Sequence, residues 1–505
     1  MAKYLLSHDI GTSADKATLF TFDGTILRSR LESYPVHYFN ANWAEQDAED
    51  WWKAFCKNNH AILEGIDPAE VAAISLSGQM MGCLPLDREG NPIRPSIIWT
   101  DGRATKQAAA LEEKVRLQSF YNIVGIRPSA NFTIEKVMWL MEHEPETYEK
   151  TYKFMQSKDF IGARLTGTFC TDPSDAGYTH AYDMYGRCWS EVIFKAAGAD
   201  VEKFPDIVEP GTLIGKVRAS VAEEAGLAPG TPVAEGVGDG RASMIGIGVL
   251  RPGDAYTCLG TSSWVSRITD APGMDPRCRI QKGAFTPGTY SDGGTMQAGG
   301  LSVNWMKSQL CLHEQELAKT GGGSAYDYIN GEIESCPAGA GGVIFLPYLM
   351  GERAPLWDNG AKGAFLGLRG ETTRAEMLRA VMEGVSMNLT IILKIMQGIK
   401  DDMTSMRIVG GGSKSAVWRQ ILADCFNMPI VKTNISDEAG SLGTAVLAGI
   451  CVGVYQDLSA VHTFHKVESV TEPIAENVAR YRQLQPIFED AYYALREINH
   501  RLGEL

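Results

Sequence analysis

A single carboxylate between two glycines stands near the middle of the chain. It is Asp239, in the stretch GVGDGRASMIGIGV that covers residues 236–249. Glycines on both sides allow backbone conformations closed to other residues and let another molecule approach the main chain closely. The small, apolar residues that follow recur at helical spacing, which predicts that a loop enters a tightly packed helix here. Such a carboxylate can take a proton from a bound hydroxyl group or simply cap the helix, and the local pattern alone favours the N-cap.

Two short polar loops could hold phosphate groups. The sequence predicts a strand from Tyr4 to His8, then the loop Asp9-Ile-Gly-Thr-Ser13, then a second strand from Lys16 to Phe22. A loop of this kind offers consecutive backbone N–H groups and two hydroxyls to phosphate oxygens, and Asp9 at its mouth can hold a metal ion directly or through water. Taken by itself, this loop is more typical of a plain hairpin turn.

The same pattern returns in the second half of the chain. CLGTSS, residues 258–263, also follows a predicted strand and leads into another, and Gly11 and Gly260 are 249 positions apart in a chain of 505 residues. That separation is close to half the chain, as a duplicated domain would give. Two similar α/β domains, each bringing a phosphate-binding hairpin to a shared cleft, would clamp a polyphosphate. Asp239 falls at the junction of the two halves.

Two further glycine-rich segments of the second half could accept a nucleotide. A glycine pair enters a predicted helix in QAGGLSVNW, residues 297–305, and three glycines follow a predicted strand in RIVGGGS, residues 407–413. Missing side chains make room there, and the free N–H groups at a helix start point outward. Neither G-x-G-x-x-G nor G-x-x-x-x-G-K-[ST] occurs, which disfavours Rossmann and P-loop sites.

Candidate binding residues of the first half follow two predicted strands. One strand, Val71 to Ser77, leads into Gly78-Gln-Met-Met-Gly82, and the segment IIWTDGR covers residues 97–103. Loops at strand ends commonly carry binding groups. Alternatives remain open, because paired methionines often fill cores and Asp101 with Arg103 could form only a surface ion pair.

The remaining elements are predicted from periodicity and turn residues. We expect a helix to start within WAEQDAEDWW, residues 43–52, and a polar turn at residues 172–175. Further helices are expected around residues 103–113, 133–142, 416–427 and 474–503.

Composition restricts the class of protein. The chain has 47 Lys and Arg against 61 Asp and Glu, a net charge of −14, which argues against general binding to nucleic acids or anionic membranes. Its ten cysteines include no C-x-x-C pair, and its nine histidines form no H-E-x-x-H, so neither a disulfide framework nor a zinc site is indicated. Without a signal peptide pattern or a long apolar run, we expect a cytoplasmic globular protein with reduced thiols.

Taken together, these stretches resemble the FGGY carbohydrate kinases, and within that family the xylulokinases, over nearly the whole chain. The matching segments are HDIGTS, WAEQDAEDWWKA, SGQMMGCLPLD, IIWTDGR, GVGDGRAS, CLGTSSWV, FLPYLMGERAP, KGAFLGLRGETTRAEMLRAVMEG and VGGGSKSAVWRQILAD. The resemblance implies two actin-like, RNase H-like α/β domains with ATP and Mg2+ in the cleft between them. It implies a sugar-binding N-terminal domain at residues 1–248, which carries the base at its end, and a nucleotide-binding domain at residues 249–505.

The resemblance also implies roles for individual residues. Asp239 matches the catalytic base, and Asp9, with Asp239, belongs to the Mg2+ site. Residues implied to bind ATP are Gly11, Thr12, Ser13, Lys16, Gly260, Thr261, Ser262, Gly300, Asn304, Gly411, Gly412 and Ser413. Residues implied to bind the sugar are Gln79, Met80, Met81, Trp99, Asp101 and Asp239. The partners implied are ATP and a small sugar, and the oligomeric state, a homodimer included, is left open.

The chain departs from the xylulokinase pattern on the sugar side. It has Met81 where those proteins usually have histidine, Thr100 where they have asparagine, and Gly240 where asparagine follows the base. A thioether cannot replace the hydrogen bond of an imidazole, so sugar discrimination should differ. D-xylulose is the predicted substrate, with L-xylulose, ribulose, another ketose or a polyol as the alternative. A non-kinase actin-like ATPase or sugar sensor is disfavoured, because the base and both phosphate loops are intact.

Overall fold

The computed structural model describes residues 2–435 and 438–504 and divides into two compact units. Unit 1 comprises Met1–Leu250, Lys282–Gly288 and Glu438–His465, and unit 2 comprises Arg251–Gln281, Thr289–Asp437 and Lys466–Leu505. The chain therefore passes between the units several times. The single boundary predicted at residue 248 is simpler than this division, because two later segments also pack into unit 1.

Unit 1 is built on a six-stranded sheet. Its strand order is β14 (Leu213–Lys216), β15 (Pro232–Gly238), β6 (Val71–Gly78), β1 (Tyr4–Ile10), β2 (Ala14–Thr21) and β3 (Ile26–Ser33). The three central strands β15, β6 and β1 are parallel, and β2, β3 and β14 pair antiparallel to their neighbours. The predicted hairpin of β1 and β2 is thus confirmed.

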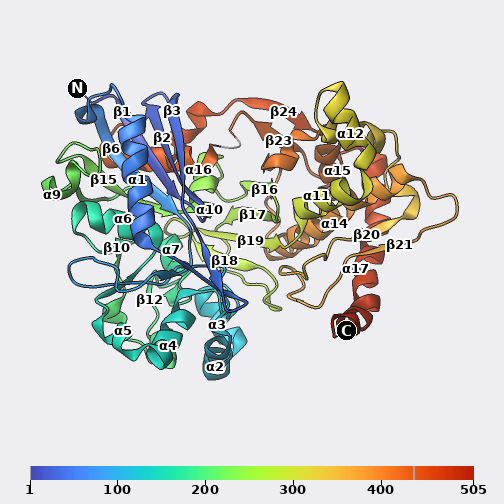
Figure 1. Ribbon diagram of the computed structural model, residues 1–505. Coiled ribbons are helices and arrows are strands. Elements are labelled where there is room, and N and C mark those ends of the chain that lie inside the picture. The colour runs from blue at the N-terminus through green and yellow to red at the C-terminus, as the bar shows by residue number, and fades with distance from the viewer. Residues whose placement is uncertain (1, 436–437, 505) are drawn as a thin grey trace. The chain divides into compact units, whose positions relative to one another are not determined.

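Helices cover both faces of this sheet (Figure 1). On one face, His8 of β1 contacts Asn59 of α1 (Ala48–Ile62), with 2.9 Å between the ring Nε2 and the amide Oδ1. On the other, Leu5 packs against Gly449 of α16 (Ala439–Cys451). Because side chains alternate along a strand, Asp9 faces the same side as Leu5. α6 (Ser157–Thr166) packs with α1, and α10 (Asp239–Gly246) packs with α16.

Smaller elements complete unit 1. The helices are α2 (Thr105–Val115), α3 (Leu117–Val124), α4 (Thr133–His143), α5 (Pro145–Lys150), α7 (Pro173–Gly177), α8 (Glu191–Ala197) and α9 (Ala219–Ala222). The strands are β4 (His37–Phe39), β5 (Trp43–Gln46), β7 (Leu84–Leu86), β8 (Ser96–Ile97), β9 (Lys153–Met155), β10 (Cys170–Thr171), β11 (Tyr182–Asp183), β12 (Cys188–Trp189) and β13 (Asp206–Ile207).

One local prediction in unit 1 is confirmed and another needs correction. The helix expected to start within residues 43–52 is α1, which begins at Ala48 after the N-cap Asp47, and the preceding segment Trp43–Gln46 is strand β5. β5 pairs with β4 and β8. The segment at 172–175, expected as a polar turn, is the buried N-cap and first turn of α7.

Unit 2 repeats the strand order of unit 1. Its sheet runs β19 (Tyr290–Met296), β17 (Ser263–Thr269), β16 (Ala255–Leu259), β22 (Met406–Val409), β23 (Ile430–Thr433) and β24 (Val467–Thr471). As in β3-β2-β1-β6-β15-β14, two antiparallel pairs are followed by two parallel pairs and a last antiparallel pair. The chain enters unit 1 along a seventh strand, β18 (Gln281–Ala284). The predicted duplication is confirmed by this order.

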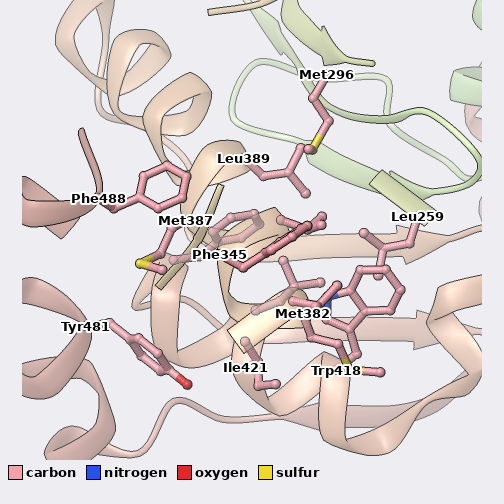
Figure 2. Packing of buried hydrophobic residues seen from close by; sticks show 14 of the residues in the cluster. Leu259, Met296, Phe345, Met382, Met387, Leu389, Trp418, Ile421, Tyr481 and Phe488 are labelled. Atoms are coloured by element: carbon pink, nitrogen blue, oxygen red, sulfur yellow. The ribbon is translucent and has the colours of Figure 1, made fainter. Parts of the chain in front are cut away.

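The core of unit 2 is organised around α14 (Arg374–Ile399). A capping box starts this helix, since the Glu376 carboxylate accepts from the Thr373 amide at 2.7 Å. Met382, Met387 and Leu389 of α14 lie among aromatic and aliphatic side chains of the surrounding strands and helices (Figure 2). The other elements are α11 (Gly299–Leu310), α12 (Leu312–Gly321), α13 (Ala325–Glu334), α15 (Ala416–Phe426), α17 (Ala475–Gly503), β20 (Ile344–Leu346) and β21 (Ala364–Leu366).

All ten cysteines carry free thiols. Over residues 2–435 and 438–504, no helix has the length and apolar character needed to cross a membrane.

Candidate active site

The first predicted phosphate loop is held by side chains from several elements of unit 1. Gly11 N donates to Ala14 O at 3.0 Å, which closes the turn between β1 and β2. The Thr12 carbonyl accepts from the Gln46 amide at 2.8 Å, and the Thr12 hydroxyl accepts from the Trp99 indole at 2.8 Å. Trp99, predicted to bind sugar, therefore also fixes the loop predicted to bind phosphate.

Gln46 links this loop to the predicted sugar-binding loop. Its amide oxygen accepts from the Gln79 side chain at 2.6 Å, while its amide nitrogen donates to Thr12 O. Both glutamines are buried, and the Gln79 side-chain oxygen has no hydrogen-bond partner among the described residues. A buried acceptor without a partner is unfavourable unless a ligand satisfies it, which suits a sugar hydroxyl. Gln46 was not among the predicted site residues, because its own segment does not show that strand β5 pairs with other segments beside this loop.

Asp239 is the first residue of α10, and Gly238 is the N-cap. The Asp239 carboxylate accepts from the adjacent Gly240 amide at 2.6 Å, so it does not cap the helix in the way that the sequence favoured. Desolvation by the surrounding protein, and then the charge of Asp9, raise the pKa of Asp239 to about 7. The residue still has solvent-exposed surface, so solvent reaches it on one side. A carboxyl group with a pKa near neutrality is suited to general base chemistry.

Asp9 lies on the sheet face covered by α10 and α16. Its Oδ1 accepts from the Ser77 hydroxyl at 2.9 Å, and burial raises the pKa of its carboxyl above the ordinary value. The repulsion between Asp9 and Asp239 would be relieved by a cation, so this pair fits a Mg2+ ion that takes its remaining ligands from phosphates and water. No cluster of three or more potential metal-binding side chains occurs among the described residues. Lys16 forms an ion pair with Glu438 at 2.6 Å.

Met80 and Met81 have different environments. Met80 is buried, and a Cβ atom placed on Gly238 would come within 2.5 Å of its sulfur, so Gly238 provides the space that Met80 fills beside the base. Met81 adopts a left-handed backbone with φ of 65° and is only partly buried. Its carbonyl accepts from the buried Lys136 ammonium at 2.8 Å, and the same ammonium donates to Ile98 O at 2.8 Å. Lys136 thus joins the two predicted sugar-binding loops, and burial lowers its pKa to about 7.

Asp101 is fully buried in an ion pair with Arg103, at 2.8 Å, rather than in a surface pair. Its carboxylate also accepts from the backbone amides of Ala44 and Arg103, at 2.6 and 2.9 Å. These contacts occupy both oxygens, so the geometry assigns Asp101 first to holding its loop. Sugar binding by Asp101 stays a prediction.

In unit 2, three glycine-containing segments meet at the end of β16. Gly300 N donates to Gly260 O at 2.8 Å, and a Cβ atom on Gly300 would lie 2.4 Å from that oxygen. On the other side, a Cβ atom on Gly412 would lie 2.7 Å from the Leu259 Cβ, whereas one on Gly411 would meet nothing within 4 Å. Glycine is thus required at positions 300 and 412 for close packing of the backbone, and Gly411 leaves open space.

Polar groups surround this glycine-lined region. Asn304, one turn into α11, accepts from the Tyr326 hydroxyl at 2.5 Å. The Ser413 hydroxyl is buried and has no partner among the described residues. α11 starts at Gly299, so the positive end of its dipole lies beside these loops, while Gly300 N already donates to Gly260 O. Thr261 O accepts from Leu301 N at 3.0 Å, which ties the second hairpin to this helix start. The structure therefore brings the predicted nucleotide residues of unit 2 together.

Known families and structures match the chain over nearly its whole length. The N-terminal domain of the FGGY family of carbohydrate kinases matches residues 4–246, and the C-terminal domain of that family matches residues 255–452. A xylulose kinase from Staphylococcus epidermidis is 31% identical over 502 residues, covering 98% of this chain and 97% of that protein. A gluconokinase from Bacillus subtilis is 29% identical over 491 residues, covering 97% of this chain and 95% of that protein. The crystal structure of a ligand-bound xylulose kinase from Lactobacillus acidophilus has a TM-score of 0.91, with 29% identity and 98% coverage of both chains.

Proposed function

The chain belongs to the FGGY family of carbohydrate kinases, and we propose that it transfers the γ-phosphoryl group of ATP to a ketopentose, D-xylulose, to give xylulose 5-phosphate. The observation that carries this proposal is the Asp239 carboxyl, which stands at the start of α10 with a pKa raised to about 7. The free thiols of the ten cysteines support a reducing cytoplasm as the location of the protein.

Phosphoryl transfer requires mainly that the protein positions the reacting groups and neutralises the developing charge. The Asp239 carboxylate accepts the proton of the sugar hydroxyl, whose oxygen forms a bond to the γ-phosphorus. The bond from that phosphorus to its bridging oxygen breaks, and ADP leaves with the electron pair. Asp9, together with Asp239, would hold Mg2+, which when bound neutralises charge on the transferred phosphoryl group.

The other site residues bind the two substrates. The first hairpin, Gly11–Ser13, with Lys16, is proposed to contact phosphate oxygens. The nucleotide is proposed to bind to Gly260, Thr261, Ser262, Gly300, Asn304, Gly411, Gly412 and Ser413. Gln79 is proposed to offer its unpaired amide oxygen to a sugar hydroxyl. Met80, Met81 and Trp99 are proposed to contact the sugar.

A second candidate substrate is a sugar acid such as gluconate. The similarity to a gluconokinase, at 29% identity, is nearly the same as the similarity to xylulose kinases. The chain also lacks the histidine and asparagine that xylulokinases usually have at positions 81 and 240. A coupled ADP assay with pentuloses, hexuloses, polyols and sugar acids at matched concentrations decides between the candidates. D-xylulose should give the highest kcat/KM, and a higher value for gluconate would move the assignment to a gluconokinase.

Asp239→Asn tests the kinase mechanism itself. Loss of the base should lower sugar-dependent ADP formation at least about a hundred-fold, with the KM for ATP nearly unchanged. Asp206→Asn, at an exposed carboxylate of the same unit, is the control and should keep the wild-type rate. Wild-type turnover in Asp239→Asn, or ADP release that does not depend on added sugar, would contradict the proposed function.

A further inference from the structure

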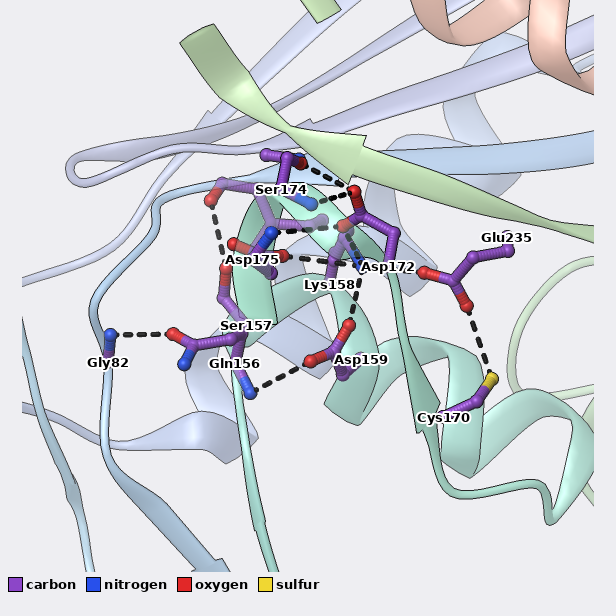
Figure 3. Close-up of polar contacts among 12 residues, drawn as sticks. Gly82, Gln156, Ser157, Lys158, Asp159, Cys170, Asp172, Ser174, Asp175 and Glu235 are labelled. Carbon is purple, nitrogen blue, oxygen red and sulfur yellow. Dashed lines mark hydrogen bonds and ion pairs between the residues drawn. The ribbon is translucent and has the colours of Figure 1, made fainter. Parts of the chain in front are cut away.

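A cluster of buried charges includes Glu235 of β15, the strand that leads into Asp239. The Lys158 ammonium, in the first turn of α6, is surrounded by four buried carboxylates (Figure 3). It lies 2.6 Å from Asp159 Oδ1, 2.6 Å from Glu235 Oε1, 3.2 Å from Asp172 Oδ1 and 3.3 Å from Asp175 Oδ2. One cation cannot balance four carboxylates, and burial raises the pKa of Glu235 to about 7. The proposed chemistry makes no use of these groups.

One member of the cluster reaches the backbone next to the base. Asp172 uses Oδ1 for Lys158 and Oδ2 for the Ser174 hydroxyl, which donates to it at 2.5 Å. The oxygen of that hydroxyl then accepts from Gly238 N at 2.9 Å. Asp172, as the N-cap of α7, also accepts from Ser174 N at 2.7 Å. The cap explains the contact to the amide of Ser174, but it does not explain why the hydroxyl turns to Gly238.

The contact to Gly238 fixes the residue that immediately precedes Asp239. The Asp239 carboxylate receives its hydrogen bond from its own neighbour, Gly240 N. That bond moves with the helix start and does not anchor the carboxylate to the rest of unit 1. The position of the carboxylate is therefore set by its backbone. Gly238 N donates to the Ser174 hydroxyl, the Ser243 hydroxyl donates to Asp239 O at 3.0 Å, and Gly238 also pairs with Gly78 of β6 in the sheet. Of the two side chains in these contacts, Ser174 is the one that lies outside α10.

We propose that Ser174 is a positioning residue for the base, held by Asp172 and the Lys158 cluster and acting through its hydrogen bond to Gly238 N. This inference rests on the proposed role of Asp239 as base. A misplacement of about 1 Å at a reacting group can lower the rate about a hundred-fold without loss of substrate binding. The four-carboxylate cluster orients Asp172, and Asp172 orients the hydroxyl.

The main variant is Ser174→Ala, which removes the hydroxyl and leaves Asp172 and Lys158 in place. We expect kcat to fall about ten-fold to a hundred-fold, while the KM values for ATP and sugar change less than about two-fold. The control is Ser190→Ala, which removes a hydroxyl of similar burial that accepts from Ile193 N at 3.4 Å at the start of α8. That variant should keep the wild-type kcat.

Ser174→Thr is the conservative rescue. Ser174 lines a cavity of about 240 Å³, shared with Val237, Arg241 and Phe285, that can take the additional methyl group. This variant should restore kcat to within about three-fold of the wild type, because it keeps both hydrogen bonds. Should Ser174→Ala be too unstable to assay, Ser174→Cys fills the volume with a weak acceptor, and a wild-type kcat in that variant overturns the proposal.

A double variant separates this inference from the proposed function. In an Asp239→Asn background, Ser174→Ala should change the residual kcat less than about two-fold, because a positioning residue acts only through the group it positions. If Ser174→Ala lowers kcat by the same factor with and without Asp239→Asn, the positioning role is overturned. A fall in kcat of Ser174→Ala that comes with a matching rise in both KM values would also overturn it. If Asp239→Asn lowers kcat and Ser174→Ala does not, the inference fails and the proposed function stands. If Asp239→Asn is fully active, both fail.

Discussion

In unit 2 the loop after β16 is held by backbone against backbone, whereas in unit 1 the equivalent loop after β1 is held by side chains as well as by backbone hydrogen bonds. Gly300 N binds Gly260 O, with no room for a Cβ atom between them. In unit 1, the Gln46 and Trp99 side chains bind the two oxygens of Thr12. The strand order is the same in both units, so the difference lies in what each loop must present. Close glycine packing and open space suit a nucleotide, and fixed polar side chains suit a sugar and a base.

The two units also differ in what their buried charges contact. In unit 1, the Lys158 cluster connects to Gly238 through Asp172 and Ser174. Unit 2 also has a buried ion pair, Arg379 with Glu383 at 2.6 Å, but it lies within α14. There it binds Tyr481 of α17. The Lys158 cluster of unit 1 is thus linked to the residue before the proposed base, whereas the Arg379 pair of unit 2 joins helices of the core.

The largest effect is expected from Lys158→Met. This change leaves four buried carboxylates without their cation, and breaking a buried charge cluster in this way typically costs about 3–5 kcal/mol. The free energy of unfolding, measured with urea, should fall by that amount. Lys432→Met is the control in unit 2, since its ion pair with Glu468 is partly exposed and should contribute less than about 1 kcal/mol. Equal losses in the free energy of unfolding for Lys158→Met and Lys432→Met would contradict the expected difference between these two charged sites.

A smaller effect is expected from a methyl group on a glycine of each unit. In Gly300→Ala the new Cβ would be 2.4 Å from Gly260 O, so the helix start must move, at about 1–3 kcal/mol. The KM for ATP should rise, while that for sugar should not. In Gly240→Ala the new Cβ meets no atom within 4 Å, and alanine favours the helix, so the free energy of unfolding should not fall. A stable Gly300→Ala variant with unchanged ATP binding would show that the glycines of unit 2 do not serve close packing.

The sequence predicted the parts of the fold that depend on local pattern. The β1 and β2 hairpin, its repeat 249 positions later, and the glycines at helix starts all depend on neighbouring residues. The repeat was informative because each copy needs the same turn chemistry between two strands. The glycines near residues 300 and 411 were informative because close packing excludes other residues.

Contacts between distant segments could not be predicted. Gln46 reaches Gln79 only because β5 pairs with strands far along the chain, and the acidic residues beside it favour a helix. Asp172 was predicted as part of a polar turn, since nothing in its own segment reveals that Lys158 lies against it. Asp101 was predicted to bind sugar, and the sequence did not indicate that Ala44 N occupies one of its oxygens.

The smallest effect is expected from a double variant, Met81→His with Gly240→Asn, which tests whether the side chains of unit 1 also select the sugar. Met81 has a left-handed backbone and its carbonyl is held by Lys136, so Met81→His changes the side chain with little strain, because histidine is enriched in that conformation. Gly240→Asn adds an amide into open space beside Asp239. Together they restore the two polar groups usual in xylulokinases, and one hydrogen bond to a sugar hydroxyl should raise the ratio of kcat/KM for D-xylulose over gluconate about ten-fold. The coupled ADP assay measures this ratio, with Met81→Leu and Gly240→Ala as controls of similar size that add no polar group. An unchanged ratio would mean that sugar selection lies elsewhere in unit 1, and the buried Gln79 oxygen would then be the next group to test.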